Sequence, residues 1–143
     1  MTGILNAIMA IGGTTAHQSP KTAADVLTDC SDGPDVLAAV VAEDHGHLIG
    51  WQSAEVWQGG AHIGTFVQPG IQATGVGAAL FAMTRVMLTK ADVPAIVASI
   101  RAANTPGLAH YASAGFVEFA QDADFTLNDG RVVGRVHRRF PLV

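Results

Sequence analysis

The chain has 143 residues, 49% of them hydrophobic and 14% charged, which is typical of one compact domain with a buried core. Acidic residues exceed basic ones by 12 to 8, and this balance disfavours nucleic acid as a partner, because binding phosphates needs a basic surface. The single cysteine, Cys30, excludes an internal disulfide, and the sequence has no Cys/His cluster with metal-ligand spacing. We therefore expect one domain over residues 1–143, without a metal, in the cytoplasm.

The N-terminal third is predicted to be helical. Residues 4–11 are apolar enough to suggest the core of a signal peptide, but no Lys or Arg precedes them and Asn6 interrupts them. Their isoleucines recur at helical spacing, and a second helix is predicted at 22–27. The longest apolar runs are shorter than the ~20 residues that a membrane span requires. No membrane association is therefore expected.

From residue 36 onward, short β-branched and aromatic runs alternate with turn residues. Segments 36–42, 48–57 and 61–67 are predicted to form a meander of three antiparallel strands. The first turn is expected at 43–46, and the second at Gly59-Gly60.

A strand, a glycine-bearing loop and a helix are expected next. Residues 78–88 have the composition and apolar spacing of a strong helix. Residues 95–100 are almost wholly apolar, as in a strand that is buried on both faces. A crossover through the helix makes this strand parallel to strand 61–67.

The C-terminal part is predicted to add a short helix and two closing strands. The helix should carry residues 108–113 and end at Gly115. The strands are expected around 116–119 and 132–140, joined by a turn at Asn128-Asp129-Gly130. The predicted class is α+β, with a central mixed sheet flanked by helices.

The loop from Gly70 to Gly77 is the first candidate binding site. Its position before a helix lets successive backbone N–H groups face one anion. A Walker A loop would end in Gly-Lys-Ser/Thr, and this one continues Gly-Val-Gly-Ala. A dinucleotide fingerprint starting at Gly75 would need Gly or Ala where Leu80 stands, and a later carboxylate that the segment 93–100 lacks. Glycines that serve only a tight turn remain an alternative.

The pattern Gln72-x-x-Gly75-x-Gly77 resembles the acetyl-CoA pyrophosphate motif of the GNAT superfamily of N-acetyltransferases. The resemblance continues downstream in the order common in that family, with Asn104, Tyr111 and Gly115-Phe116. Members similar to phosphinothricin acetyltransferases are closest. The resemblance implies a GNAT-like, mixed and mostly antiparallel sheet flanked by helices, here lacking the usual first strand.

The resemblance also implies acetyl-CoA as co-substrate and a role for each matching residue. Tyr111 would protonate the departing CoA thiolate, which suits a phenol of pKa about 10. The loop would bind the pyrophosphate mainly through backbone amides, because the positions of Ala73 and Thr74, often basic in the family, are neutral here. The residues implied to bind acetyl-CoA are Phe66, Val67, Gln72, Ala73, Thr74, Gly75, Val76, Gly77 and Asn104.

Amine acetylation also needs a group that accepts the ammonium proton. Glu55 and His62 are the candidates nearest the centre of the predicted sheet, although a solvated glutamate and a hydrogen-bonded structural histidine are the alternatives. The loop 12–17 resembles part of the acceptor pocket in the phosphinothricin acetyltransferase-like members. We interpret Trp51 and Trp57 as packing residues of the core or of an interface, in preference to residues that line the acceptor pocket.

The expected function is acetyl transfer from acetyl-CoA to a primary amine of a small molecule. The alternatives are a protein N-acetyltransferase and a GNAT-like module that binds acyl-CoA without turnover. Without a first strand, segment 36–42 would form a sheet edge that pairs with another chain, so a homodimer is expected.

Overall fold

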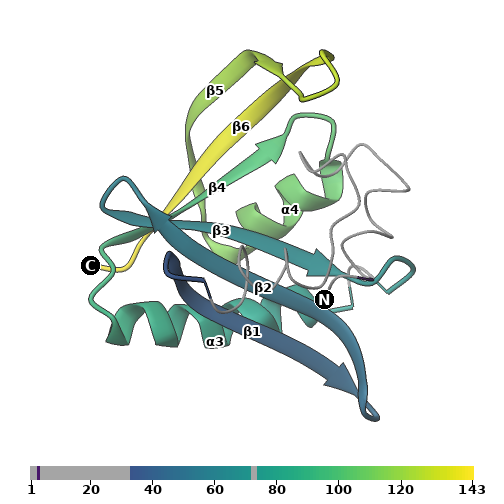
Figure 1. The fold of residues 1–143 in the computed structure, drawn as a ribbon, viewed down its shortest axis with the longest axis vertical. Coiled ribbons are helices and arrows are strands. Elements are labelled where there is room, and N and C mark those ends of the chain that lie inside the picture. The colour runs from purple at the N-terminus through teal and green to yellow at the C-terminus, as the bar shows by residue number, and fades with distance from the viewer. Residues whose placement is uncertain (1–2, 4–32, 72–73) are drawn as a thin grey trace.

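A computed structural model describes residues 3, 33–71 and 74–143, and Figure 1 shows their arrangement. The predicted N-terminal helices and the loop 12–17 lie outside these residues, as do Gln72 and Ala73. The described elements are, in order, β1 (Val36–Asp44), β2 (His47–Trp57), β3 (Gly60–Val67), α3 (Val76–Lys90), β4 (Ala95–Arg101), α4 (Thr105–Ala114), β5 (Val117–Thr126) and β6 (Val132–Pro141).

The described strands form one six-stranded sheet in the order β1-β2-β3-β4-β6-β5. The pair β3–β4 is parallel and the other neighbours are antiparallel. This confirms the predicted α+β class with a mixed, mostly antiparallel sheet. Among the described residues, no helix has the length and apolarity that a membrane crossing needs.

Helices α3 and α4 cover one face of the sheet, because that face carries small and branched apolar side chains. Leu88 of α3 and Tyr111 of α4 belong to the same buried cluster as Ala54, Ile63 and Ile96, one from each of the strands β2, β3 and β4. Side chains alternate along a strand, so the residues between these point to the opposite face. We call the face under α3 and α4 the helix face, and the other one the open face.

The fifth strand departs most from the sequence-based expectation. It was expected around 116–119, but β5 covers Val117–Thr126, and Phe116 lies buried just before it. Phe116 packs with Phe81, Tyr111 and Phe140 in an aromatic cluster. Because β5 is an edge strand in the described sheet, with mostly exposed residues and two register irregularities, it lacks the regular apolar alternation that marks a strand.

The parallel strands β3 and β4 are paired over a short stretch only. Their register pairs are Ala61 with Ile96 and His62 with Val97. Beyond His62 the strands diverge toward their C-terminal ends, as Figure 1 shows. The two parallel strands are therefore splayed apart at the centre of the sheet, and the candidate site is built around this divergence.

Candidate functional site

The diverging end of β3 presents main-chain groups toward β4. The N–H of Gln68 donates to the carbonyl of Ile49 at 2.8 Å. This bond shows which residues of β3 direct their main-chain N–H and C=O groups toward β2. In an antiparallel ladder every second residue bonds to the partner strand, so Phe66 faces β2, and Thr65 and Val67 face β4. The Phe66 ring stacks on Trp51, 4.3 Å between centroids. The main-chain groups of Phe66 are therefore directed to β2, and those of Val67 to the side of β4.

The start of α3 fits an anion. Gly75 is its N-cap, in the left-handed region at φ 90°, and no side chain of the described residues caps the helix. A Cβ on Gly75 would meet no described atom within 4 Å. Thr74 Oγ1 turns back to donate to the carbonyl of Ile71 at 2.6 Å. Main-chain N–H groups at the positive end of the helix are therefore the donors for a ligand there.

Gly77 has a different role from Gly75. A Cβ on Gly77 would lie 2.8 Å from Cε1 of His110, so only glycine lets α3 approach the His110 ring on α4 this closely. Burial lowers the pKa of His110 below its usual value of 6.5, which favours the neutral ring in this contact. The second glycine of the motif therefore allows α3 and α4 to pack closely against each other.

Helix α4 brings Tyr111 under the diverging strands. Asn104 is its N-cap, and its Oδ1 accepts a hydrogen bond from the Gly107 N–H at 3.0 Å. Gly115 ends the helix in the left-handed region at φ 101°, and the Phe116 N–H donates to the Tyr111 carbonyl at 3.0 Å. The predicted helix and its C-cap are confirmed. The structure gives Asn104 a capping role that the sequence analysis did not consider.

The hydroxyl of Tyr111 ends a chain of hydrogen-bonded polar side chains on the helix face. Gln52 Nε2 donates to Thr65 Oγ1 at 2.8 Å, and Thr65 Oγ1 lies 2.8 Å from the Tyr111 hydroxyl. Burial raises the pKa of Tyr111 to about 12, although the Thr65 hydrogen bond opposes this shift. Tyr111 is therefore neutral near pH 7. The sequence analysis did not identify Thr65 and Gln52 as site residues. The feature that could have pointed to them is that they are two polar residues opposite each other in the β2–β3 register.

Glu55 and His62 lie on the open face, away from Tyr111. They are directly opposite each other on β2 and β3, and the Trp57 ring lies 6.1 Å from the His62 ring. Burial, and next the charges of His137 and Arg135, lower the pKa of His62 below 6.5. His62 is therefore uncharged at neutral pH and able to accept a proton. Trp51 is fully buried, which confirms its interpretation as a packing residue.

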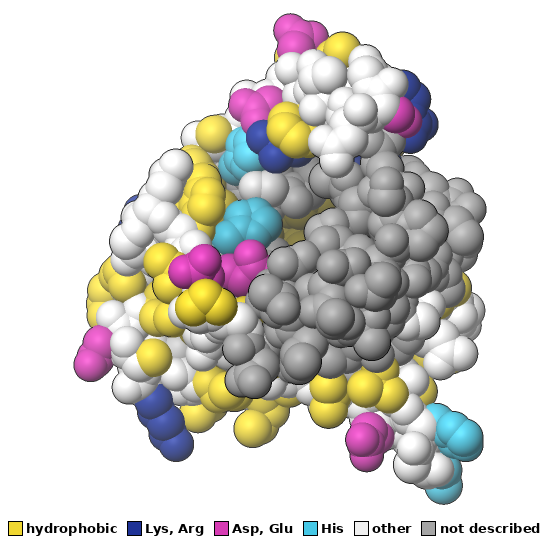
Figure 2. All heavy atoms as spheres, in the orientation of Figure 1, with side chains coloured by type: hydrophobic (Ala, Val, Ile, Leu, Met, Phe, Trp, Pro, Cys, Tyr) yellow, Lys and Arg dark blue, Asp and Glu magenta, His cyan; other side chains and the backbone are white. Residues whose placement is uncertain are grey.

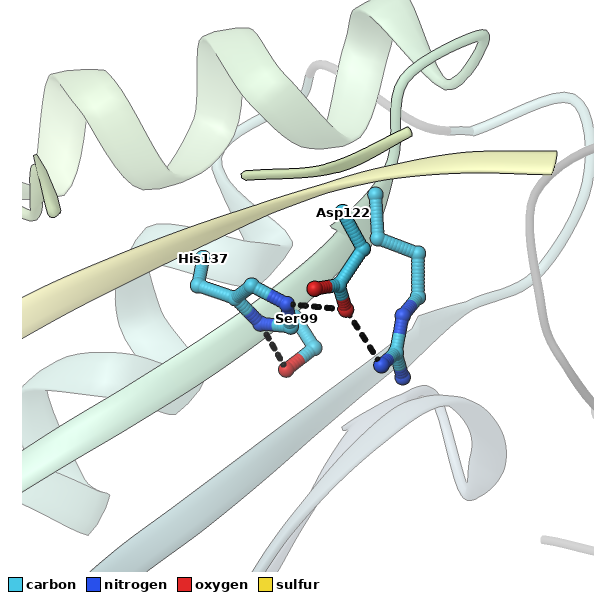
Figure 3. A network of polar contacts seen from close by, with 4 residues as sticks. Ser99, Asp122 and His137 are labelled. Carbon is cyan, nitrogen blue, oxygen red and sulfur yellow. Dashed lines mark hydrogen bonds and ion pairs between the residues drawn. The ribbon is translucent and has the colours of Figure 1, made fainter. Parts of the chain in front are cut away.

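A second polar network on the open face was missed by the sequence analysis. Ser99 Oγ lies 2.8 Å from His137 Nδ1, and His137 Nε2 lies 2.8 Å from Asp122 Oδ2. Arg135 Nη2 donates to the same carboxylate oxygen at 2.7 Å. Figure 3 shows these side chains converging from β4, β5 and β6, and Figure 2 shows histidine and acidic side chains gathered on the face in view.

The comparisons with known proteins concern the fold. No protein-family model matches the chain, and no curated protein does. Solved structures do match it. A GNAT superfamily phosphinothricin acetyltransferase from Sinorhizobium meliloti, solved in complex with acetyl-CoA, is 19% identical, with a TM-score of 0.83 over 98% of this chain and 80% of that one. The chain has the GNAT fold.

Two further structures show how widely this fold is shared. An N-acetyltransferase from Staphylococcus aureus is 13% identical, with a TM-score of 0.84 over 99% of this chain and 90% of that one. The ribosomal-protein-S18-alanine N-acetyltransferase from Escherichia coli is 23% identical, with a TM-score of 0.71 over 88% of this chain and 80% of that one. The GNAT fold is thus shared at low sequence identity.

The burial of Tyr111 can be measured directly, because it is the only tyrosine in the chain. We expect the phenolate absorbance of the folded protein to rise with a midpoint near 12, against the ordinary 10.0 in denaturant. Since the folded state keeps its proton where the unfolded state has lost it, stability should fall as pH rises from about 10 to 12. Thr65→Val, which removes the opposing hydrogen bond, should raise the midpoint further. A midpoint near 10 in the folded protein would contradict the burial of the Tyr111 hydroxyl.

Proposed function

We propose that this chain is an acetyl-CoA-dependent N-acetyltransferase that acetylates a primary amine of a small molecule. The observation that carries the proposal is the divergence of β3 and β4 between a helix N-terminus that no described side chain caps and the buried Tyr111 hydroxyl. The acetyl-CoA complex of the phosphinothricin acetyltransferase with the same fold supports it. That neighbour covers more of this chain, at a higher TM-score, than the ribosomal-protein acetyltransferase does, which favours a small acceptor over a protein N-terminus.

The residues around the divergence suit acetyl-CoA. The pyrophosphate would lie at the start of α3, where a Cβ on Gly75 would meet no described atom and where Val76 and Gly77 offer N–H groups. The pantetheine arm is an extended chain with amide groups, so it can pair with the Val67 side of β3 as a strand would. Gln72, Ala73 and Asn104 are assigned to the same ligand from the family resemblance. Acetyl-CoA supplies an acyl group activated as a thioester.

Tyr111 would act on the leaving sulfur as a hydrogen-bond donor. A thiol has a pKa of about 8.5, so full proton transfer from a phenol of pKa about 12 is uphill in the free protein. Thr65 can donate to the phenolic oxygen, which leaves the Tyr111 proton directed at the sulfur as negative charge develops there. We therefore assign Tyr111 to stabilisation of the thiolate, with the proton moving as CoA departs.

The acceptor amine would approach from the open face, opposite Tyr111. The uncharged His62 and its cross-strand neighbour Glu55 are the groups proposed to accept its proton. Calorimetry with acetyl-CoA, combined with a thiol-release assay on amino acids, simple alkylamines and peptide N-termini, tests the function. Binding without thiol release would indicate a non-catalytic acyl-CoA-binding module, and release with peptides alone a protein acetyltransferase.

Gly75→Glu should abolish acetyl-CoA binding by placing a carboxylate beside the pyrophosphate. Gly75→Ala is the matched control, because both variants force a Cβ onto a backbone at φ 90°, a strain of about 1 kcal/mol. Calorimetry should show that the Glu variant binds at least about tenfold more weakly than the Ala variant, which corresponds to about 1.4 kcal/mol of repulsion. Equal acetyl-CoA affinities of the two variants would show that the pyrophosphate does not bind at this loop.

Tyr111→Phe should keep the ring packing but remove the proton donor. We expect turnover to fall roughly ten- to thousandfold, with the acetyl-CoA dissociation constant almost unchanged. A purely structural tyrosine would instead change the melting temperature and leave the rate per folded molecule intact. Initial rates with the best amine of the panel, measured beside thermal unfolding, distinguish these outcomes.

The expected homodimer also remains a proposal. In the described sheet β1 and β5 are the edge strands, and Val41 on β1 is 46% exposed. Light scattering at micromolar concentration should give twice the chain mass. If β1 forms the interface, Val41→Lys should shift the protein toward monomer, whereas Val86→Lys at an exposed site on α3 should not. A monomeric wild-type protein would exclude the dimer.

A further inference from the structure

Gln52 is a polar side chain buried inside the apolar core. It is fully buried on the helix face, directly opposite Thr65 in the β2–β3 register. Its Nε2 donates to Thr65 Oγ1 at 2.8 Å, and its Oε1 has no hydrogen-bond partner among the described residues. A methionine has nearly the same shape and would leave no polar atom unsatisfied, so packing alone would favour methionine here. The amide group therefore calls for an explanation other than packing.

The amide sets the direction of the hydrogen bonds that lead to Tyr111. An –NH2 group only donates, so Thr65 Oγ1 accepts from Gln52. Within the described part of the chain, the contacts of Thr65 Oγ1 are those with Gln52 and Tyr111. The single proton of the Thr65 hydroxyl is thus donated to the Tyr111 oxygen, 2.8 Å away. The Tyr111 proton then points away from Thr65 and is the one left for a ligand.

The opposite orientation of the amide would reverse these hydrogen bonds. With Oε1 toward Thr65, the Thr65 hydroxyl would donate to Gln52 and accept from Tyr111, which would use up the Tyr111 proton. Both N–H groups of the amide would then lie where Oε1 now lies, a position without a partner among the described residues. Buried N–H groups without an acceptor are rarer in proteins than carbonyls without a donor. The orientation seen in the structure is therefore the favoured one.

The neighbours of Tyr111 leave its hydroxyl little freedom of position. The ring is buried, and it meets the rings of His110 and Phe116 edge-on, with centroids 4.8 Å and 5.1 Å away. The Thr65 contact holds the oxygen at the other end. What can still change is the direction of the O–H bond, because a hydroxyl proton rotates to suit its partners. The direction of the hydrogen bonds therefore decides which side of the hydroxyl a ligand meets.

We infer that Gln52 is a positioning residue, which orients Thr65 so that the Tyr111 hydroxyl presents its proton, and not its lone pairs, to the leaving sulfur. The leaving group is that of the proposed function, on which this inference rests. The amine nitrogen bonds to the thioester carbonyl carbon, the carbon–sulfur bond breaks, and the sulfur takes the bonding electrons and a proton from Tyr111. Thr65 still donates to the phenolate that remains. The amine releases one proton, and Tyr111 regains one from solvent.

The direction can be observed without any ligand, because Tyr111 is the only tyrosine in the chain. The intensity ratio of the tyrosine Raman doublet is high when the phenol oxygen accepts a hydrogen bond and low when the hydroxyl only donates one. At neutral pH we expect a higher ratio in the full-length wild-type protein than in Thr65→Val, which removes the donor to that oxygen. Gln52→Met, which lets the Thr65 hydroxyl turn either way, should give a ratio between the two.

Two controls separate the direction of the hydrogen bonds from core packing. Thr65→Ser keeps the hydroxyl and should keep the wild-type ratio. Thr84→Val also replaces a fully buried polar residue, but the Thr84 hydroxyl bonds only to the Leu80 carbonyl of its own helix. Thr84→Val should change the melting temperature and leave the Raman ratio and the turnover as in the wild type. If Gln52→Met does not fold by circular dichroism, Gln52→Asn, whose amide is one methylene shorter, replaces it.

Kinetics connect the direction to the reaction. With the best amine of the panel, Gln52→Met should lower turnover roughly three- to thirtyfold and leave the KM for acetyl-CoA almost unchanged, because the proton acts on bond cleavage and not on binding. In a Tyr111→Phe background, the same substitution should have no further effect, because the proton that it directs is absent. A purely structural glutamine would lower the rate by the same factor in both backgrounds.

The outcomes separate the role of Gln52 from the proposed function. A wild-type Raman ratio no higher than that of Thr65→Val would mean that Tyr111 donates to Thr65, and overturns the inference even if amines are acetylated. Equal effects of Gln52→Met in the two backgrounds would also overturn it and leave the acetyltransferase intact. If the protein neither binds nor turns over acetyl-CoA, the proposed function fails, and the role of Gln52 in transfer falls with it whatever the Raman ratios are.

Discussion

The parallel pairing of β3 with β4 stops after His62 and Val97, and the candidate site depends on that stop. A ladder that continued would satisfy the main-chain groups of β3 with those of β4 and close the centre of the sheet. In the proposed function, the part of β3 beyond this point faces the amide groups of acetyl-CoA, which is an extended ligand.

The sheet then separates two kinds of proton chemistry. On the helix face, burial and the Thr65 contact keep Tyr111 neutral, which suits a donor to a leaving group. On the open face, burial holds His62 uncharged at neutral pH, which suits an acceptor of protons. Strand alternation produces this division without any special backbone, since neighbouring residues on one strand belong to opposite faces. An acyl group placed between the faces has a donor on one side and an acceptor on the other.

Much of the fold could be predicted because its elements are regular and local. The period of the apolar residues revealed the strands and helices from Val36 to Gly115, and the crossover rule gave the parallel pair. The polar networks could not be read in the same way. Ser99 and His137 are 38 positions apart, and they meet only because β6 inserts between β4 and β5. Strand order and register depend on the packing of the whole sheet, which no short motif encodes.

Gly75 and Gly77 serve different constraints, and this affects how such motifs persist in evolution. Gly75 is needed for its left-handed backbone, and a Cβ there would meet no described atom within 4 Å. Gly77 is needed because His110 leaves no room for a Cβ. Selection for stability alone would therefore preserve Gly77, and part of the preference for Gly75, in a descendant that had stopped binding any ligand. A glycine motif of this kind can therefore persist after the activity is lost. Proteins that have lost catalysis are better recognised by changes at their polar site residues than by changes at their glycines.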